Sequence, residues 1–167
     1  MQIIHSHRFL LVVAALLTSS FVSAETIQGK VIRVADGDTI TILDQTITQH
    51  KIRLAGIDAP EKGMPFGQKS KEHLSDLVAG KQVQVETNKV DRYGRNVGKV
   101  IVDGLDANLS QIDAGFAWHY KAYEREQSVV DRLAYDKAEK RAREAKKGLW
   151  LDGEPVPPWE WRRTSKP

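Results

Sequence analysis

Short stretches of alternating apolar and polar residues dominate the first part of the chain. The segment 26–43 contains two of them, separated by the turn sequence Asp36-Gly37-Asp38, and a third covers residues 50–55. Successive side chains of a strand point to opposite faces, so alternation of this kind predicts strands. In the third stretch Arg53 lies on the face opposite the apolar residues, and Asp38 stands at the mouth of the second predicted strand.

Helical and strand patterns follow one another over the middle of the chain. Residues 66–78 carry apolar side chains at helical spacing and are closed by Gly80, a pattern typical of a helix and its C-terminal stop. Two further strands are expected, one around residues 83–85 and one over residues 97–102. The polar stretch 88–96 predicts a long hairpin loop between them.

The last third of the chain predicts two helices and a tail. Asp106 is a suitable N-cap for a short helix that ends at Gly115. Residues 129–147 form a longer helical pattern. We expect the stripe on its packed face to consist of Leu133, Ala134, Ala138, Ala142 and Ala145. Because prolines oppose helix formation, we expect residues 151–167 to form an irregular tail that its tryptophans hold against the body.

The order of these elements predicts a fold class. Five short strands, with a helix after the third and further helices at the end, are typical of an α+β protein with a mostly β core. The arrangement matches a five-stranded Greek-key barrel of the oligonucleotide/oligosaccharide-binding (OB) type with about three helices. We expect one domain over residues 25–150, with residues 151–167 packed on it. A fold of this kind identifies no activity by itself.

The first 24 residues have the pattern of a signal peptide. Arg8 precedes an apolar run over residues 9–17, and Val22-Ser23-Ala24 supplies the small residues that signal peptidase prefers. The run falls short of the ~20 apolar residues of a membrane span, which disfavours an anchor. We therefore expect cleavage near Ala24 and an exported monomer, periplasmic or secreted, without stable membrane association. The sequence contains no cysteine, so disulfides are excluded.

Net charge is a weak guide to the partner of this protein. The formal charge of the chain is only +3, which does not by itself argue for nucleic acid. Basic residues are denser between residues 137 and 147, and the tail adds Arg162, Arg163 and Lys166. Solvated surface positions explain these charges better than specific phosphate contacts.

Three short motifs combine carboxylates with arginines. They are Asp36-Gly37-Asp38-Thr39, the segment from Arg53 to Glu61, and Asp91-Arg92-Tyr93-Gly94-Arg95. Calcium or magnesium needs oxygen ligands, water attack on a phosphodiester needs a base, and the charge that develops on phosphorus needs fixed cations. Each motif alone also fits a turn, a cap, an exposed ion pair or a hairpin loop. Together they favour a metal-assisted phosphodiesterase.

In their order and approximate spacing, the three motifs resemble those of the staphylococcal nuclease family, which includes thermonuclease and micrococcal nuclease. The resemblance extends from about residue 26 to residue 150. It implies an OB-type barrel and a calcium-dependent endonuclease that acts on DNA and/or RNA. In that family the bond to the 5′ oxygen is broken, which leaves 3′-phosphate ends.

The resemblance also implies a calcium site. Carried over position by position, Asp38 and Asp58 would be the carboxylate ligands, and Ala59 would offer its backbone carbonyl. We expect Asp36 to support these ligands without binding the ion itself. The best-known member of the family has threonine at the position of Ala59, a change that a backbone ligand tolerates.

The remaining roles implied by the resemblance concern the substrate. Glu61 would be the general base, and Arg53 and Arg95 would hold the phosphate, since a planar guanidinium meets two phosphate oxygens at once. Tyr120 and Tyr123 fall near the family's nucleotide-supporting tyrosines, although their spacing differs from the family pattern.

Two other functions use the same residues. One is a catalytically silent barrel that binds nucleic acid or another protein, and the other is a phosphodiesterase for a different phosphoester. The presence of Glu61 together with both arginines argues against the silent barrel, because binding alone needs no base. Phosphate contacts carry no base information, so the sequence predicts no base preference.

Overall fold

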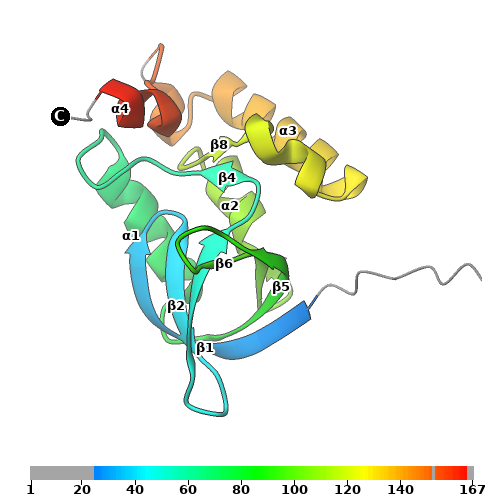
Figure 1. Ribbon diagram of the computed structural model, residues 1–167. Helices are drawn as coiled ribbons and strands as arrows, with labels where there is room; N and C mark the ends of the chain where they lie inside the picture. The colour runs from blue at the N-terminus through cyan, green and yellow to red at the C-terminus, as the bar shows by residue number, and fades with distance from the viewer. Residues whose placement is uncertain (1–24, 152, 165–167) are drawn as a thin grey trace, which may run out of the picture.

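The computed structural model describes residues 25–151 and 153–164 (Figure 1). The predicted signal peptide, residues 1–24, lies outside the described residues. Five strands form a closed barrel and several helices surround it, which confirms the predicted α+β, OB-type fold. The barrel strands are β1 (Glu25–Asp36), β2 (Thr39–Leu43), β3 (Gln49–Leu54), β5 (Gln82–Val90) and β6 (Asn96–Val102).

The barrel closes through one parallel contact. Antiparallel pairs join the strands in the order β3-β2-β1-β5-β6, and the parallel pair β3–β6 completes the ring. The long strand β1 pairs with two strands: its first half with β5 and its second half with β2. Register shifts between Val31 and Arg33 and between Val34 and Asp36 mark bulges in β1, and bulges bend a strand.

The predicted alternation of faces is present in β2 and β3. Ile40, Ile42 and Ile52 are fully buried, and Leu54 is nearly so. These side chains fill the barrel together with residues of β1, β5 and β6. Arg53 lies on the other face of β3, where polar contacts are available.

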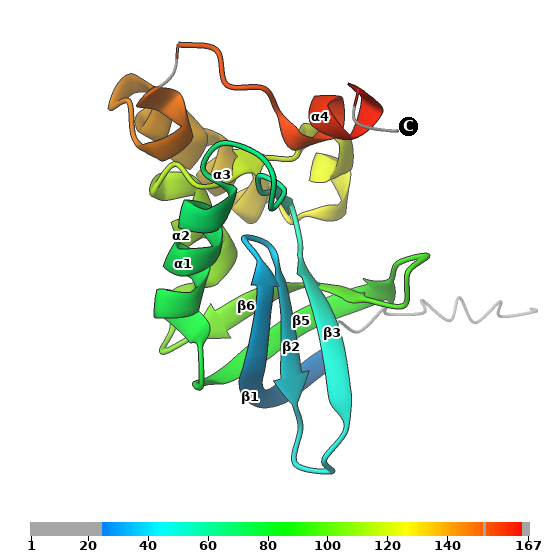
Figure 2. The same cartoon turned by 90° about the vertical axis from the view of Figure 1, so that its left-hand side faces the viewer.

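The helices gather beside the barrel and over one of its ends (Figures 1 and 2). They are α1 (Gly67–Val78), α2 (Ala107–Asp113), α3 (Val129–Glu144) and α4 (Pro158–Thr164), with the 3-10 turns η1 (Lys121–Glu126) and η2 (Gly148–Leu151). Three two-residue strands complete the fold: β4 (Ile57–Asp58), β7 (Leu105–Asp106) and β8 (Trp118–His119). None of the helices in the described part of the chain is long and apolar enough to cross a membrane.

Several predicted boundaries are wrong by a few residues. The hairpin loop covers only 91–95, because β5 continues to Val90 through a register shift after Thr87. Helix α3 ends at Glu144 rather than at residue 147. The N-cap of α2 is confirmed, since the Asp106 side chain accepts a hydrogen bond from the Leu109 amide at 2.9 Å.

The buried face of α3 also differs from the predicted stripe. Ala138 and Ala142 are buried as expected, but Leu133 is 64 % exposed and Tyr135 is buried in its place. Ala145 is also exposed, and it lies just beyond the end of α3. The Tyr135 hydroxyl donates to Asp106 Oδ2 at 2.8 Å. A buried hydroxyl needs a hydrogen-bond partner, and Asp106, the N-cap of α2, provides it for this residue of α3.

The tail is not irregular throughout, as the prolines suggested. Pro158 begins α4, and proline is tolerated at the first helical position because the amide there has no partner within the helix. The Trp159 ring lies 6.3 Å from that of Trp118 and 5.3 Å from that of Tyr120. The helix is therefore packed on β8 and on the start of η1.

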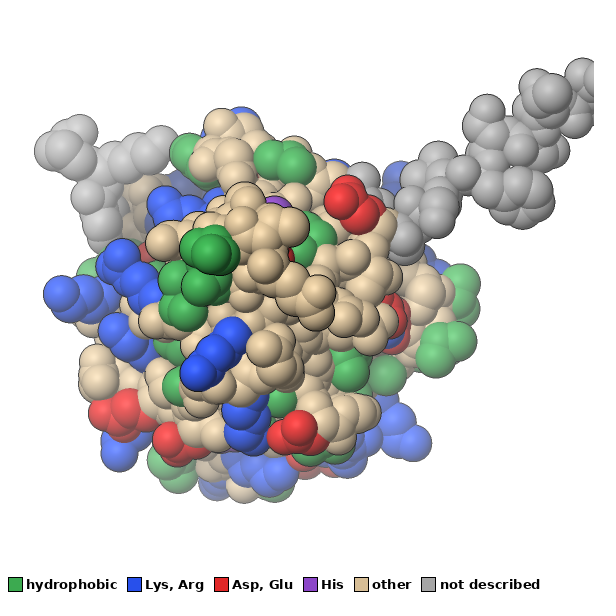
Figure 3. All heavy atoms as spheres, turned by 90° about the horizontal axis from the view of Figure 1, so that it is seen from below, with side chains coloured by type: hydrophobic (Ala, Val, Ile, Leu, Met, Phe, Trp, Pro, Cys, Tyr) green, Lys and Arg blue, Asp and Glu red, His purple; other side chains and the backbone are tan. Residues whose placement is uncertain are grey.

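The far end of the barrel has a mixed surface. Seen from below, basic and acidic side chains are interspersed among apolar ones (Figure 3). Such a face offers no concentrated positive field for a polyanion.

Candidate active site

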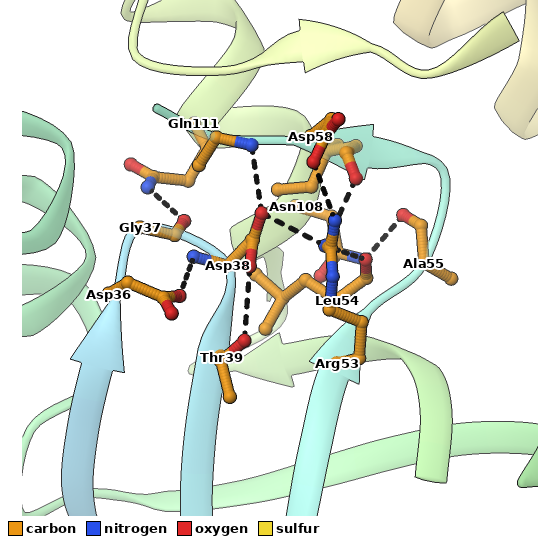
Figure 4. Close-up of polar contacts among 12 residues, drawn as sticks. Asp36, Gly37, Asp38, Thr39, Arg53, Leu54, Ala55, Asp58, Asn108 and Gln111 are labelled. Atoms are coloured by element: carbon orange, nitrogen blue, oxygen red, sulfur yellow. Dashed lines mark hydrogen bonds and ion pairs between the residues drawn. The ribbon is translucent and has the colours of Figure 1, made fainter. Parts of the chain in front are cut away.

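The turn after β1 and the end of β3 lie side by side at one end of the barrel (Figure 4). Thr39 pairs with Arg53 in the β2–β3 register, and the Leu54 amide donates to the Asp38 carbonyl at 2.8 Å. The antiparallel pairing thus brings the start of β2, next to Asp38, beside the end of β3, which carries Arg53.

Arg53 lies between two carboxylates that come from different segments. Its Nη1 is 3.1 Å from Asp38 Oδ2, and its Nη2 is 2.9 Å from Asp58 Oδ1. Nη1 also donates to the carbonyls of Leu54 and Ile57 at 3.1 and 3.0 Å. Only 14 % of the side chain is exposed. The guanidinium is therefore a fixed cation, held by backbone as well as by charge.

Asp38 binds the segment that follows β4. Besides the contact with Arg53, its Oδ2 accepts a hydrogen bond from the Ala59 amide at 2.8 Å, and its Oδ1 accepts one from the Thr39 hydroxyl at 3.1 Å. These bonds fix the backbone of Ala59, the predicted carbonyl ligand, next to the Asp38 carboxylate.

Asp58 is the most buried carboxylate of the site. It belongs to β4, which pairs with β8 so that Asp58 lies opposite Trp118, and its side chain is 1 % exposed. Removal from water raises the pKa of Asp58 above its usual range, although the hydrogen bond from Arg162 and the charge of Arg53 act in the opposite direction. Positive charge at this position therefore favours the ionised form.

Asp36 supports the turn rather than reaching the centre of the site. Its Oδ1 accepts a hydrogen bond from the Asp38 amide at 3.1 Å. Burial, followed by the charge of Asp38, raises the pKa of Asp36 to about 6. Between them, Gly37 is packed so closely that an added Cβ would lie 2.8 Å from the Ala59 Cβ and collide with the Ser70 hydroxyl. Only glycine fits there.

Two buried amides of α2, which the sequence analysis did not single out, hold the turn and the strand ends. Gln111 donates to the Gly37 carbonyl at 2.6 Å. Asn108 donates to the Ala55 and Gly98 carbonyls at 3.0 and 3.2 Å. Both side chains are fully buried. Their spacing of one helical turn, beside the buried face of a short helix, is the sequence signal that would have found them.

Glu61 lies at the more open side of the site, where 42 % of its side chain is exposed. Its Oε1 accepts a hydrogen bond from Arg162 Nη1 at 2.6 Å. Arg162 also donates from Nη2 to Asp58 Oδ2 at 2.6 Å and from Nη1 to Asp58 Oδ1 at 3.3 Å. The expectation that the basic residues of the tail are simply solvated is wrong for Arg162.

Arg95 makes its contacts within its own hairpin. Its Nε is 2.8 Å from Asp91 Oδ2, and its guanidinium lies over the Tyr93 ring, 5.4 Å from the centroid. The β3–β6 register pairs the next residue, Asn96, with Ile52, so Arg95 lies beside β3 but short of its end. Among the described residues, the polar contacts of Arg95 do not include the carboxylates of the site.

The two tyrosines assigned to nucleotide support follow β8, the short strand that pairs with the strand of Asp58. The Tyr120 amide donates to the Gly56 carbonyl at 2.9 Å, and the Tyr120 and Tyr123 rings meet edge to face at 5.1 Å. One face of Tyr120 is covered by Trp159, whose ring is stacked on it at an interplanar angle of 10°. Tyr123 is 47 % exposed.

The oxygen groups at this end of the barrel suit a hard divalent cation. The carboxylates of Asp38 and Asp58 both form ion pairs with Arg53. Calcium and magnesium prefer oxygen ligands of this kind. Residues 25–151 and 153–164 contain no group of three histidine, cysteine or acidic side chains arranged to hold a metal ion. An ion bound to this pair would need backbone, water or substrate oxygens to complete its coordination, which is the composition of an open site.

Comparisons with known proteins show which family the chain resembles. A family model described as staphylococcal nuclease homologue matches residues 51–152. A protein of Escherichia coli described as an uncharacterized endonuclease is 44 % identical over 137 residues, which cover 81 % of this chain and 85 % of that protein. A protein with the same description from Haemophilus influenzae is 39 % identical over 163 residues, covering 96 % and 88 %. The micrococcal nuclease of Shigella flexneri is 42 % identical over 150 residues, covering 83 % and 82 %.

The family model covers more than half of the chain, and relatives with these identities cover most of it. Asp38, Arg53, Asp58 and Glu61 of the site come from the motifs that carry the resemblance, whereas Arg162 comes from the tail. The chain belongs to the staphylococcal nuclease family.

Proposed function

We propose that this nuclease is a calcium-dependent endonuclease that hydrolyses phosphodiester bonds of DNA and/or RNA and leaves 3′-phosphate ends. The observation that carries the proposal is the position of Arg53. This guanidinium lies between two largely buried carboxylates at the barrel mouth, with Glu61 joined to the same cluster through Arg162. Calcium binding, phosphate contact and proton transfer would then occur within one cluster of side chains.

In this proposal the residues have separate tasks. Asp38, Asp58 and the Ala59 carbonyl would hold calcium, which when bound supplies Lewis acidity toward a phosphate oxygen. Glu61, the more exposed carboxylate, would accept the proton of the attacking water. Arg53 would present a fixed positive charge to the phosphate as negative charge develops.

Arg95 requires a rearrangement before it can contact the same phosphate. Its guanidinium is paired with Asp91 in the hairpin, and this ion pair would have to open as the substrate arrives. An ion pair that is partly exposed is weak, so substrate phosphate can replace Asp91 at small cost. Tyr120 and Tyr123 would support the nucleotide beside Asp58.

Glu61 distinguishes this proposal from a silent binding module. A module that only binds a polyanion gains nothing from an acidic side chain next to its phosphate site, because like charges repel. A base with that position is useful in hydrolysis. The same residues suit another phosphoester, and the substrate therefore has to be found by experiment.

The test is a matrix of substrates and metals. Residues 25–167 are incubated with single-stranded DNA, duplex DNA and RNA, each with calcium, magnesium or a chelator. A Glu61→Gln variant purified in parallel controls for contaminating nucleases. We expect cleavage with calcium, none with chelator, and 3′-phosphate ends. Failure to cleave any of the three polymers under all conditions would favour the silent module or another phosphoester.

We further propose that the protein is exported as a monomer, periplasmic or secreted, after cleavage near Ala24, and is not stably bound to a membrane. The charged start and short apolar run of residues 1–24 support this. Expression of the full chain, followed by fractionation, N-terminal sequencing and size-exclusion chromatography, tests all parts. An intact N-terminus in the membrane fraction would contradict the export proposal.

A further inference from the structure

One short helix contacts two separate parts of the candidate active site. On α4, Arg162 reaches Asp58 and Glu61, while Trp159 is stacked on Tyr120. More than a hundred residues of chain separate Arg162 from these carboxylates. The helix therefore covers both the proposed metal and base groups and one proposed nucleotide-supporting ring.

The guanidinium of Arg162 occupies the ligand atoms that a metal would use. Asp58 Oδ2 lies 2.6 Å from Arg162 Nη2, and Asp58 Oδ1 lies 2.9 Å from Arg53 Nη2. Both oxygens of this buried carboxylate are thus engaged by cations. Glu61 Oε1 likewise lies 2.6 Å from Arg162 Nη1, so the same guanidinium engages one oxygen of the proposed base.

Of the two arginines on Asp58, Arg162 is the one placed to leave. Arg53 is 14 % exposed and is also bound to the Leu54 and Ile57 carbonyls. Arg162 is 41 % exposed, and its guanidinium is bound to carboxylates alone among the described residues. An exposed ion pair exchanges its partner at a smaller cost than a buried one.

The rest of α4 supplies a moderate anchor. Trp159 packs against Trp118 and Tyr120, and Pro158 is buried. The last residue on this helix before the end of the described chain, Thr164, is exposed. A helix of seven residues is not stable by itself, so these few contacts decide whether it stays docked.

We propose that α4 is a built-in competitor of the active site, in which Arg162 occupies the carboxylates of Asp58 and Glu61 until a divalent cation and substrate displace it. This inference rests on the proposed function, because it takes Asp58 as a metal ligand and Glu61 as the base. Docked α4 keeps both carboxylates paired with Arg162. Displaced α4 frees Asp58, Glu61 and the covered face of Tyr120 together.

Calcium binding to the metal-free protein tests the competition without relying on activity. Isothermal titration with calcium alone is carried out on the wild-type chain and on Arg162→Ala. If α4 is docked about nine-tenths of the time, removal of the competing guanidinium should tighten calcium binding about tenfold. Circular dichroism and thermal unfolding verify that each variant is folded.

Arg163→Ala is the matched control. Arg163 is the next residue on the same helix and is exposed, and among the described residues it makes no ion pair with Asp58 or Glu61. The variant changes net charge by the same amount, but an exposed charge is largely screened, so we expect its calcium affinity to stay within about twofold of the wild type. A gain as large as that of Arg162→Ala would mean that general charge explains the effect and would overturn the proposal.

Trp159→Ala tests the helix separately from the arginine. This variant retains Arg162 but loses the stacking on Tyr120 that keeps α4 docked. We expect calcium to bind more tightly than in the wild type, by a smaller factor than in Arg162→Ala. Unchanged affinity would contradict the part assigned to the helix.

Two further outcomes separate the failure of this inference from failure of the proposed function. Equal calcium affinities of wild type and Arg162→Ala would overturn the competition but leave the proposed calcium site intact. If that variant also bound single-stranded DNA more weakly than the wild type, Arg162 would be a substrate ligand rather than a competitor. Absence of calcium binding in both proteins would overturn the proposed calcium site, and the competition with it.

Discussion

Replacing Arg53 by methionine tests whether its guanidinium offsets the cost of burying the negative charges of Asp38 and Asp58. The side chain makes ion pairs of 3.1 Å with Asp38 and 2.9 Å with Asp58. Methionine keeps most of the apolar stem but removes every donor. Removal of one partner from a buried pair costs ~3–5 kcal/mol. We expect a loss of ~3 kcal/mol in the free energy of unfolding, at the lower end, because Asp58 retains its contact with Arg162.

Urea unfolding of the metal-free protein, followed by tryptophan fluorescence, measures this loss. Arg33→Met is the matched control, since Arg33 is exposed on β1 and its replacement should change the free energy of unfolding by less than ~0.5 kcal/mol. Calcium should restore part of the stability of Arg53→Met, because an ion that binds only the folded state stabilises it. If Arg53→Met were as stable as the control, the reasoning from the two ion pairs would be refuted.

Three other predictions concern turnover and packing. Arg95→Lys should lower kcat by on the order of 10²-fold while KM changes little, because lysine keeps the charge but loses the fork; an unchanged kcat at saturating substrate would exclude the role. Asp38→Asn should bind calcium more weakly and regain activity at high calcium, whereas Glu61→Gln should stay inactive at saturating calcium. If high calcium restored the rates of both variants equally, Glu61 would be a metal ligand or a structural residue rather than the base. Tyr135→Phe should lower the free energy of unfolding by ~1–2 kcal/mol through the lost hydrogen bond to Asp106, and urea unfolding with no loss would contradict this.

The barrel and the central part of the site were predictable because their signals are local. Alternation in β2 and β3 predicts both the buried apolar face and the position of Arg53 on the opposite face. The turn sequence after β1 then places Asp38 at the mouth of β2. Antiparallel pairing of consecutive strands makes the two mouths adjacent, so no long-range information was needed.

The packed face of α3 was not predictable in the same way. Its pattern offers both Leu133 and Tyr135 as packed residues, and periodicity alone favours the leucine on the alanine stripe. Tyr135 can be buried because Asp106 of the preceding segment accepts a hydrogen bond from its hydroxyl. That partner lies 29 residues away in sequence, beyond the reach of a helical window.

The contacts of Arg162 could not be predicted from the sequence for two reasons. The prolines of the tail opposed a helix, although Pro158 occupies the one helical position where proline is favourable. In addition, the docking of α4 depends on Trp118 and Tyr120, which come from a different part of the chain. The sequence shows a basic tail and several carboxylates, but it does not indicate which of these charges form ion pairs.

If the site binds metal as proposed, the ion pairs that stabilise it without metal would oppose metal binding. Asp38, Asp58 and Glu61 bring three carboxylates to one end of the barrel, and Arg53 and Arg162 are the cations that contact them. A site stabilised in this way needs no ion to fold. If a divalent cation binds there as proposed, like charges would be brought together unless one arginine moved away. Arg53 is held by backbone carbonyls in the barrel, which leaves the residue on the last helix as the exchangeable cation.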